Sequence, residues 1–255
     1  MKDNHVRNLC YNRYKVTRHS AAQSVTPILG AAATGSENIM VQLVRQRLSW
    51  RLTIYGWMFV VGALLLVCIL FTLSVHSFLS YQNPVSARTI VISGTLPDSA
   101  IEAIIGDVGS DPNLLIVTVG GPITRGSRLS LYRDYANFTA ARIEKIGRYN
   151  ANVVAVPSSP TERDRVYESA LALRAWMHRT DVKINSINVY TMGVRSRRTQ
   201  ILFDMAFEDE IEVGVISIHD PSYDHRKWWS TSQGVRTVSG ELIAYSYAKF
   251  LFWPE

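Results

Sequence analysis

Several widespread motifs for catalysis and cofactor binding are missing from this sequence. It contains no G-x-G-x-x-G, no Walker A sequence, no G-x-S-x-G, no C-x-x-C and no H-E-x-x-H. Such motifs hold phosphates in glycine-rich turns, expose a serine nucleophile or bind zinc. A standard dinucleotide site, a P-loop and a serine hydrolase are therefore not supported.

Cysteines and convincing metal-ligand patterns are scarce as well. The two cysteines are Cys10 and Cys68, so the residues beyond position 68 form no disulfide among themselves. A short polar stretch near the C-terminus holds His219, Asp220, Asp224 and His225, but its spacing matches no strong metal-binding pattern. No metal site is predicted, and the sequence names no cofactor.

Charge is absent from one long stretch, 52–75. As a helix these residues span about 36 Å, which is enough for a hydrocarbon core of about 30 Å. Tyr55 and Trp57 lie near one end, where aromatic rings favour the headgroup zone. A cleaved signal peptide is the alternative, but the run is too long, begins past residue 50 and has no small-x-small site close behind it. The pattern predicts a transmembrane helix.

The positive charge is confined to the N-terminal tail. The chain has a net charge of +6 and a pI of about 9.4, yet the residues beyond 51 hold equal numbers of basic and acidic side chains. A neutral C-terminal domain argues against nucleic acid as a partner. The tail contains eight basic residues against Asp3 and Glu37: Lys2, Arg7, Arg13, Lys15, Arg18, Arg45, Arg47 and Arg51.

The positions of these charges predict the topology of the chain. Arg45, Arg47 and Arg51 flank the apolar run on one side, whereas the other side has no Lys or Arg before Arg88. The positive-inside rule then predicts a cytoplasmic N-terminus. We expect a basic cytoplasmic tail (1–51), a transmembrane helix (52–75), a linker (76–87) and a domain (88–255) on the periplasmic side of an inner membrane.

From Arg88 onward, apolar runs alternate with segments of helical periodicity. Near-continuous runs rich in Val and Ile are typical of strands buried on both faces of a parallel sheet. The alternation predicts an α/β fold, a Rossmann-like, doubly wound, mainly parallel five-stranded sheet. The strands are expected at 89–95, 114–121, 152–158, 186–192 and 213–219, and helices at 129–146, 160–178, 195–207 and 236–252.

Ligands of such sheets bind beyond the carboxyl ends of the strands, so the residues at those ends are site candidates. Gly120, Gly121, Pro122 and Arg125 follow the second strand, and glycines there let backbone amides approach an anion. A plain tight turn is the alternative interpretation.

The third strand is followed by Asp164 and Arg165 in the first turns of the next helix. Ser159 is expected to be the N-cap of that helix, with Pro160 at its first position and Glu162 three residues after the cap. A carboxylate near a helix N-terminus is also mildly stabilising, so a structural role for Asp164 is an equal alternative.

Three arginines follow the fourth strand. Thr191 ends the strand, Gly193 permits a sharp turn, and Arg195, Arg197 and Arg198 open the next helix. Cations are disfavoured at a helix N-terminus, so these guanidiniums are expected to pair with a negatively charged group. That group is Asp164, Glu168 or a bound anion, and at least one of the three arginines is expected to face solvent.

In their order and placement, these motifs resemble the ElyC/SanA/YdcF family of bacterial envelope proteins. The resemblance covers about residues 88–252 and rests on Gly-Gly-Pro after the second strand, Asp-Arg after the third, Thr191-x6-Arg198 after the fourth, and Glu241 in the last helix. It implies that Gly120 and Gly121 are the family's diglycine and that Glu241 is its C-terminal acid. Departures are Arg195 where the family has His and Val166 where it tends to have Thr.

The resemblance implies a role in peptidoglycan or surface-polysaccharide assembly but supplies no reaction. One hypothesis is a binding protein for a phosphorylated sugar or lipid-linked envelope precursor, with Asp164 and Glu241 orienting the arginines or acting as acid and base. A second is a hydrolase or transferase on such a ligand, using His219, Asp220 or Glu241. A third is a non-catalytic interaction module anchored in the lipid bilayer.

Overall fold

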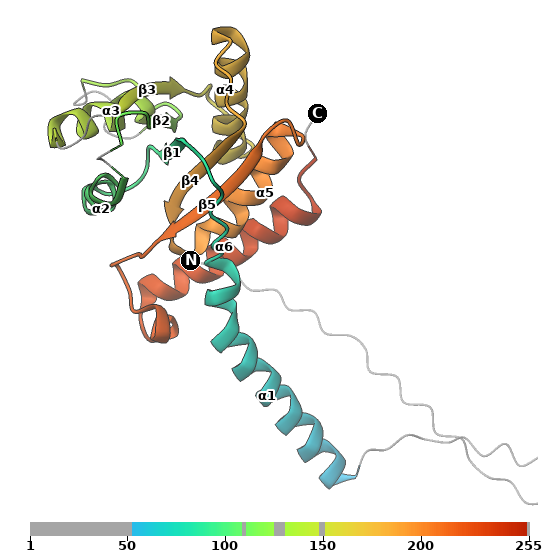
Figure 1. Cartoon of the computed structure of the whole chain (residues 1–255). Coiled ribbons are helices and arrows are strands. Elements are labelled where there is room, and N and C mark those ends of the chain that lie inside the picture. The colour runs from blue at the N-terminus through green and yellow to red at the C-terminus, as the bar shows by residue number, and fades with distance from the viewer. Residues whose placement is uncertain (1–52, 109–110, 125–130, 148–150, 254–255) are drawn as a thin grey trace, which may run out of the picture. The chain divides into compact units, whose positions relative to one another are not determined.

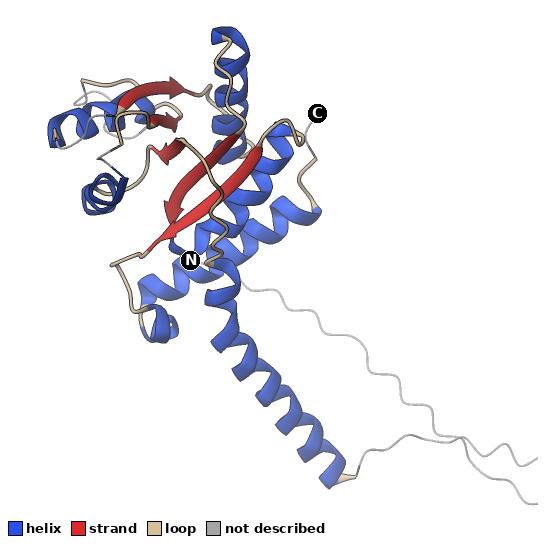
Figure 2. Ribbon diagram, viewed as in Figure 1, coloured by secondary structure: helices blue, strands red, loops and turns tan. Residues whose placement is uncertain are grey.

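The computed structural model describes residues 53–253, apart from 109–110, 125–130 and 148–150 (Figure 1). The predicted tail, 1–51, and the candidate Arg125 therefore lie outside the described residues. Figure 2 shows a sheet with helices on both faces and a long helix, α1 (Ile54–Leu79), leading into it.

The sheet has five parallel strands in the order β3-β2-β1-β4-β5. Buried Val and Ile side chains fill both faces of the central strands, which confirms the interpretation of the near-continuous apolar runs. All five predicted strands are present, with bounds close to those expected: β1 (Thr89–Ser93), β2 (Leu115–Gly120), β3 (Asn152–Pro157), β4 (Ser186–Met192) and β5 (Glu212–Ile218).

Helices cover the sheet on two sides, as in a doubly wound fold. Alternate residues of β1 point to opposite faces: Ile90 and Ile92 pack with α2 (Asp98–Val108) and α3 (Tyr135–Ile146). Val91 packs with α4 (Arg165–Thr180) and α5 (Ser196–Phe207) on the other face. Two short 3-10 helices, η2 (Gly193–Arg195) and η3 (His225–Ser230), precede α5 and α6 (Ser232–Phe250) respectively.

Two helices begin later than the sequence predicts. α4 begins at Arg165 and not at 160, because the Asp164 carboxylate accepts hydrogen bonds from the amides of Val166 (2.8 Å) and Tyr167 (3.4 Å) and is the N-cap in place of Ser159. In the same way α3 begins at Tyr135, capped by Asp134. The loop before α4 is thus free to line the carboxyl edge of the sheet.

The helix α1 is long and apolar enough to cross a membrane. It extends past the predicted boundary at Val75, and its last turn belongs to the domain core, where Val75 and Leu79 are buried. The carbonyl of Leu79 accepts a hydrogen bond from the Ser196 hydroxyl (3.1 Å), and that of Phe78 accepts one from Arg197. Two of the orphan carbonyls at the helix end are therefore satisfied by the domain.

The segment expected to be a linker is packed along the sheet. Asn83 pairs with Val215 at the free edge of β5 through two backbone hydrogen bonds. The Asn188 side chain bonds both the amide and the carbonyl of Val85, at 2.9 and 2.8 Å. A Cβ on Gly214 would lie 2.2 Å from the Asn188 Oδ1 atom, so this crossing requires glycine. The domain is thus joined to α1 without a free tether.

Gly94 offers a test of the packing between β1 and α3. A Cβ at this position would lie 2.7 Å from the Tyr135 carbonyl oxygen and 2.8 Å from the Tyr135 Cβ. We expect Gly94→Ala to lower the free energy of unfolding by about 1–3 kcal/mol, as overpacking does. Urea denaturation of the full chain in detergent measures this change.

Gly106→Ala is the matched control. Gly106 lies on α2 with no atom within 4 Å of its would-be Cβ, and alanine should raise stability by about 0.5–1 kcal/mol through helix propensity. Equal effects of the two substitutions would contradict the close approach of Tyr135.

Candidate functional site

A cavity of about 330 Å³ lies at the carboxyl ends of the strands. The ends of three neighbouring strands contribute Ser93, Gly120 and Thr191. The loop that precedes α4 and the first turns of α4 and α5 contribute further polar residues, as do the loops after β1 and β2 and the start of α3. This is the edge at which doubly wound sheets bind ligands.

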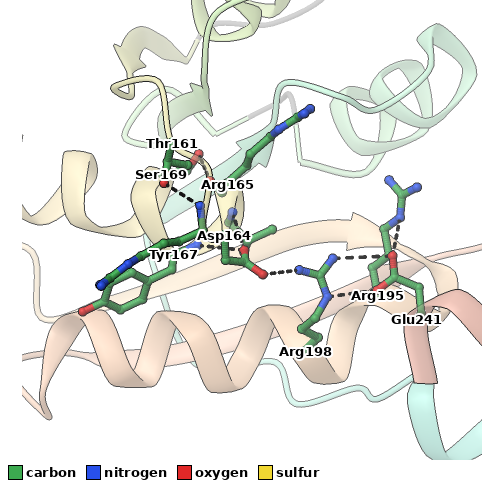
Figure 3. A network of polar contacts seen from close by, with 10 residues as sticks. Thr161, Asp164, Arg165, Tyr167, Ser169, Arg195, Arg198 and Glu241 are labelled. Atoms are coloured by element: carbon green, nitrogen blue, oxygen red, sulfur yellow. Dashed lines mark hydrogen bonds and ion pairs between the residues drawn. The ribbon is translucent and has the colours of Figure 1, made fainter. Parts of the chain in front are cut away.

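Arg198 connects three helices beside this cavity (Figure 3). Its Nε donates to Glu241 of α6 at 3.0 Å, and its Nη1 donates to Asp164 at the start of α4 at 2.9 Å. The three side chains are only 11–13 % exposed. Burial acts to lower the pKa of Arg198, but Glu241 and Asp164 outweigh it and raise the pKa above its usual value, so the guanidinium stays charged.

Asp164 and Glu241 lie behind the arginines and do not line the cavity. One Asp164 oxygen caps α4 and the other accepts from Arg198. Glu241 is shared, since Arg195 Nε lies 3.2 Å from its Oε1 atom. Both carboxylates are thus occupied by hydrogen bonds and ion pairs, an arrangement that suits the orienting role considered for them.

The three arginines of the stretch 195–198 have different surroundings. Arg195 and Arg198 both line the cavity, but Arg198 is buried between carboxylates whereas the Arg195 side chain is 45 % exposed. Arg197 points elsewhere: its guanidinium lies 4.1 Å from the Phe78 ring centroid and 4.5 Å from that of Tyr81. The expectation of a negative partner holds for Arg195 and Arg198, but Arg197 contacts aromatic rings and a carbonyl.

Arg165 also lines the cavity, and it forms no ion pair with any described residue. In Figure 3 its side chain extends away from the Asp164–Arg198 pair. Glu162 is the one carboxylate among the described lining residues. The cavity wall therefore has a cation that is not neutralised by an ion pair.

Gly120, at the end of β2, and Gly121, directly after it, have different roles. A Cβ on Gly120 would lie 2.8 Å from the Tyr135 Cβ, so this glycine lets α3 pack closely on β2. Gly121 has more room, with the Ser158 hydroxyl 3.4 Å from its would-be Cβ. Pro122 forms an isolated bridge with Asp134, and all three residues line the cavity.

Hydroxyl groups form much of the wall, and the sequence interpretation above did not single most of them out. Their signal was available: a Ser or Thr stands at or next to the end of β1, β3 and β4, and Thr124 follows β2 four residues after its end. Hydroxyls both donate and accept hydrogen bonds, which suits a phosphate or a sugar. The lining hydroxyl residues are Ser93, Thr95, Thr124, Tyr135, Ser158, Ser159, Thr161, Ser169, Thr191 and Thr199.

The polar stretch after β5 lines a second, smaller cavity of about 190 Å³ next to α1. His76 Nε2 lies 3.2 Å from the Tyr223 hydroxyl, and the His225 ring packs between those of His76 and His219. Burial raises the pKa of Tyr223 to about 12, so its hydroxyl stays protonated. No three side chains in the described part of the chain are arranged to hold a metal ion.

Comparison with models of protein families and with curated proteins finds no match to this chain. The resemblance to the ElyC/SanA/YdcF family therefore stays a prediction. The fold and the strand-end cavity define the chain as an α/β, Rossmann-like protein with one helix able to span a membrane.

Arg198→Met tests the buried network. Removing the guanidinium leaves the buried Asp164 carboxylate without a cation and leaves Glu241 with Arg195 alone, and breaking such a buried pair costs about 3–5 kcal/mol of unfolding free energy. Chemical denaturation of the full chain in detergent, at neutral pH, measures the loss.

The control is Arg165→Met, which removes a cation of the same kind from an exposed position with no ion pair among the described residues. Its effect should stay within about 0.5 kcal/mol. A loss for Arg198→Met no larger than that of the control would show that the network is unimportant for stability.

Proposed function

We propose that this chain is a single-pass membrane protein whose C-terminal domain binds an anionic, phosphate-bearing ligand at the carboxyl edge of its sheet. The cavity volume of about 330 Å³ lies within the range of small-ligand sites, roughly 300–1,000 Å³. α1 supplies the anchor, since it is long and apolar enough to cross the membrane.

The observation that carries the proposal is the presence of Arg165 and Arg195 on a wall of hydroxyl groups. Arg165 has no ion pair among the described residues, and Arg195 uses only its Nε atom on Glu241. Guanidiniums bind phosphate oxygens with two parallel hydrogen bonds. Three N–H groups of Arg198 are directed to carboxylates, which leaves two of its five.

The cellular role follows from the resemblance to envelope proteins and from the charge bias around α1. We place the N-terminus in the cytoplasm and the domain in the periplasm of a bacterial inner membrane. There the ligand would be a phosphorylated sugar or a lipid-linked precursor of peptidoglycan or surface polysaccharide. No role for nucleic acid is proposed.

The cavity supports binding better than catalysis. A hydrolase or transferase needs a titratable group beside the reacting bond. The three candidates for that group, His219, Asp220 and Glu241, do not line this cavity, and the one carboxylate in its described lining is the exposed Glu162. The first two line the second cavity instead. Asp164 and Glu241 are therefore assigned to hold Arg195 and Arg198 in place.

Ligand-induced stabilisation tests the binding site. The full chain in detergent is heated with inorganic phosphate, nucleotide sugars and a short-chain polyprenyl phosphate in turn, because truncation before residue 80 would remove the buried Val75 and Leu79. A ligand at ten times its dissociation constant adds about 1.4 kcal/mol to the unfolding free energy. We expect such a shift, and its loss in the double variant Arg165→Gln/Arg195→Gln.

Two further variants make this test specific. Arg179→Gln removes the same charge near the other end of α4, outside this cavity, and should retain the shift. Glu162→Gln removes a carboxylate from the lining and should increase the shift if the ligand is an anion. Absence of a shift with every compound, or equal shifts in all variants, would refute an anion site here.

A further inference from the structure

The level of the membrane surface can be located on α1. Apolar side chains of α1 are exposed from Ile54 to Phe71, a rise of about 27 Å for 18 residues. Above this stretch the domain covers one side of the helix: the Trp228 indole donates to the Thr72 carbonyl at 3.1 Å and Val75 is buried, whereas Leu73 is still 56 % exposed. A hydrocarbon core of about 30 Å therefore ends where the domain begins.

Two elements of the domain lie at this level. η3 contacts α1 through Trp228, and α6 contacts it through Tyr245, whose ring centroid is 5.4 Å from that of Phe78. Figure 1 shows α6 as the outermost helix of the domain on the side from which α1 emerges, running across the direction of α1. A face of α6 directed away from the sheet is thus near the membrane surface.

That face is apolar in the C-terminal half of α6. Ile243, Phe250 and Leu251 are 67–70 % exposed, and Trp253 just beyond the helix is 80 % exposed. Ile243, Tyr247 and Phe250 are spaced by four and three residues, so they share one side of the helix. Tyr245 and Ala248, on the opposite side, are buried.

Lys249 is the one exposed charge in the C-terminal half of α6. Three further exposed basic residues, Arg226, Lys227 and Arg236, lie in η3 and in the N-terminal turns of α6, next to the exposed Asp224. The only acid of α6 is Glu241, which is turned inward to Arg195 and Arg198. Exposed basic and aromatic side chains around an apolar stripe are typical of helices that lie in the headgroup region of an anionic membrane.

We propose that the C-terminal half of α6, together with Leu251 and Trp253, lies in the headgroup region of the leaflet into which α1 inserts. The proposal rests on the membrane anchoring by α1 proposed above. α6 contacts α1 close to where the exposed apolar stretch of α1 ends, and this level selects the lipid leaflet as the occupant of the exposed apolar face.

Spin-label accessibility in nanodiscs tests this contact. In a cysteine-free chain (Cys10→Ser, Cys68→Ala), a label is placed by Ile243→Cys or Phe250→Cys. Leu66→Cys on the exposed part of α1 is the lipid reference, and Glu144→Cys on α3 is the water reference. α3 packs on β2 and β3, at the end of the sheet farthest from β5.

The nanodiscs contain phosphatidylethanolamine and phosphatidylglycerol, and collisions with oxygen and with a water-soluble nickel chelate are measured. We expect the oxygen-to-nickel ratio at 243 and 250 to be several-fold above that at 144 and to approach that at 66. A ratio at 243 and 250 equal to that at 144, with 66 in lipid, overturns the proposal and leaves the anchor intact.

Two other outcomes are distinct from these. Labels at 243 and 250 that are shielded from both probes would show a protein cover, from a second copy or from residues 1–51, and would also overturn the proposal. A water-like ratio at 66 would instead refute the membrane anchoring on which the inference rests.

Discussion

One guanidinium joins the helices around the carboxyl edge of this sheet. Arg198, on α5, is held by Asp164 before α4 and by Glu241 on α6. Charges with so little exposure are tolerated only when their partners are in place. With Arg195 the four side chains form a network of two cations and two anions, which is neutral as a whole. The relative positions of three helix segments, and thereby the shape of the cavity, depend on that neutrality.

This network also explains why nearby cations differ in what they are able to do. Arg198 is largely committed to the fold, while Arg195 and Arg165 have donors left for the cavity. Arg197 caps the end of α1 through the Phe78 carbonyl and stacks on Phe78 and Tyr81. Arg197 and Arg198 thus have structural contacts, Arg195 is shared between Glu241 and the cavity, and Arg165 is available to a ligand. The difference depends on which of these arginines has a carboxylate of a neighbouring helix within reach.

The fold was readable from the sequence because strands buried on both faces leave a strong local signal. The apolar runs around Ile116 and Val189 are typical of strands buried on both faces. The placement of Thr191 and Arg195 at the cavity follows from the rule that parallel sheets bind ligands at the carboxyl ends of their strands. The local sequence pattern gave a wrong prediction where the structure of a segment depends on residues far away in the sequence. Asn83 and Val85 read as a linker because their partners, Val215 and Asn188, lie more than 100 residues away. The predicted start of α4 was wrong because Ser159-Pro160 followed by Glu162 is a local N-cap pattern, whereas in the structure the Asp164 carboxylate caps the helix.

The last turn of α1 is buried in the domain, and the chain from Ser80 to Val85 is bonded to the sheet. A domain on a flexible tether sweeps a volume set by the length of the tether and meets targets throughout it. Here the domain cannot explore such a volume, because it is packed against α1 and keeps one orientation relative to this helix. In the membrane setting proposed, encounters are then governed by lateral and rotational diffusion of the anchor. A ligand carried in the same leaflet would be met by a search in two dimensions, whereas a target at a distance from the surface would have to come to the cavity by itself.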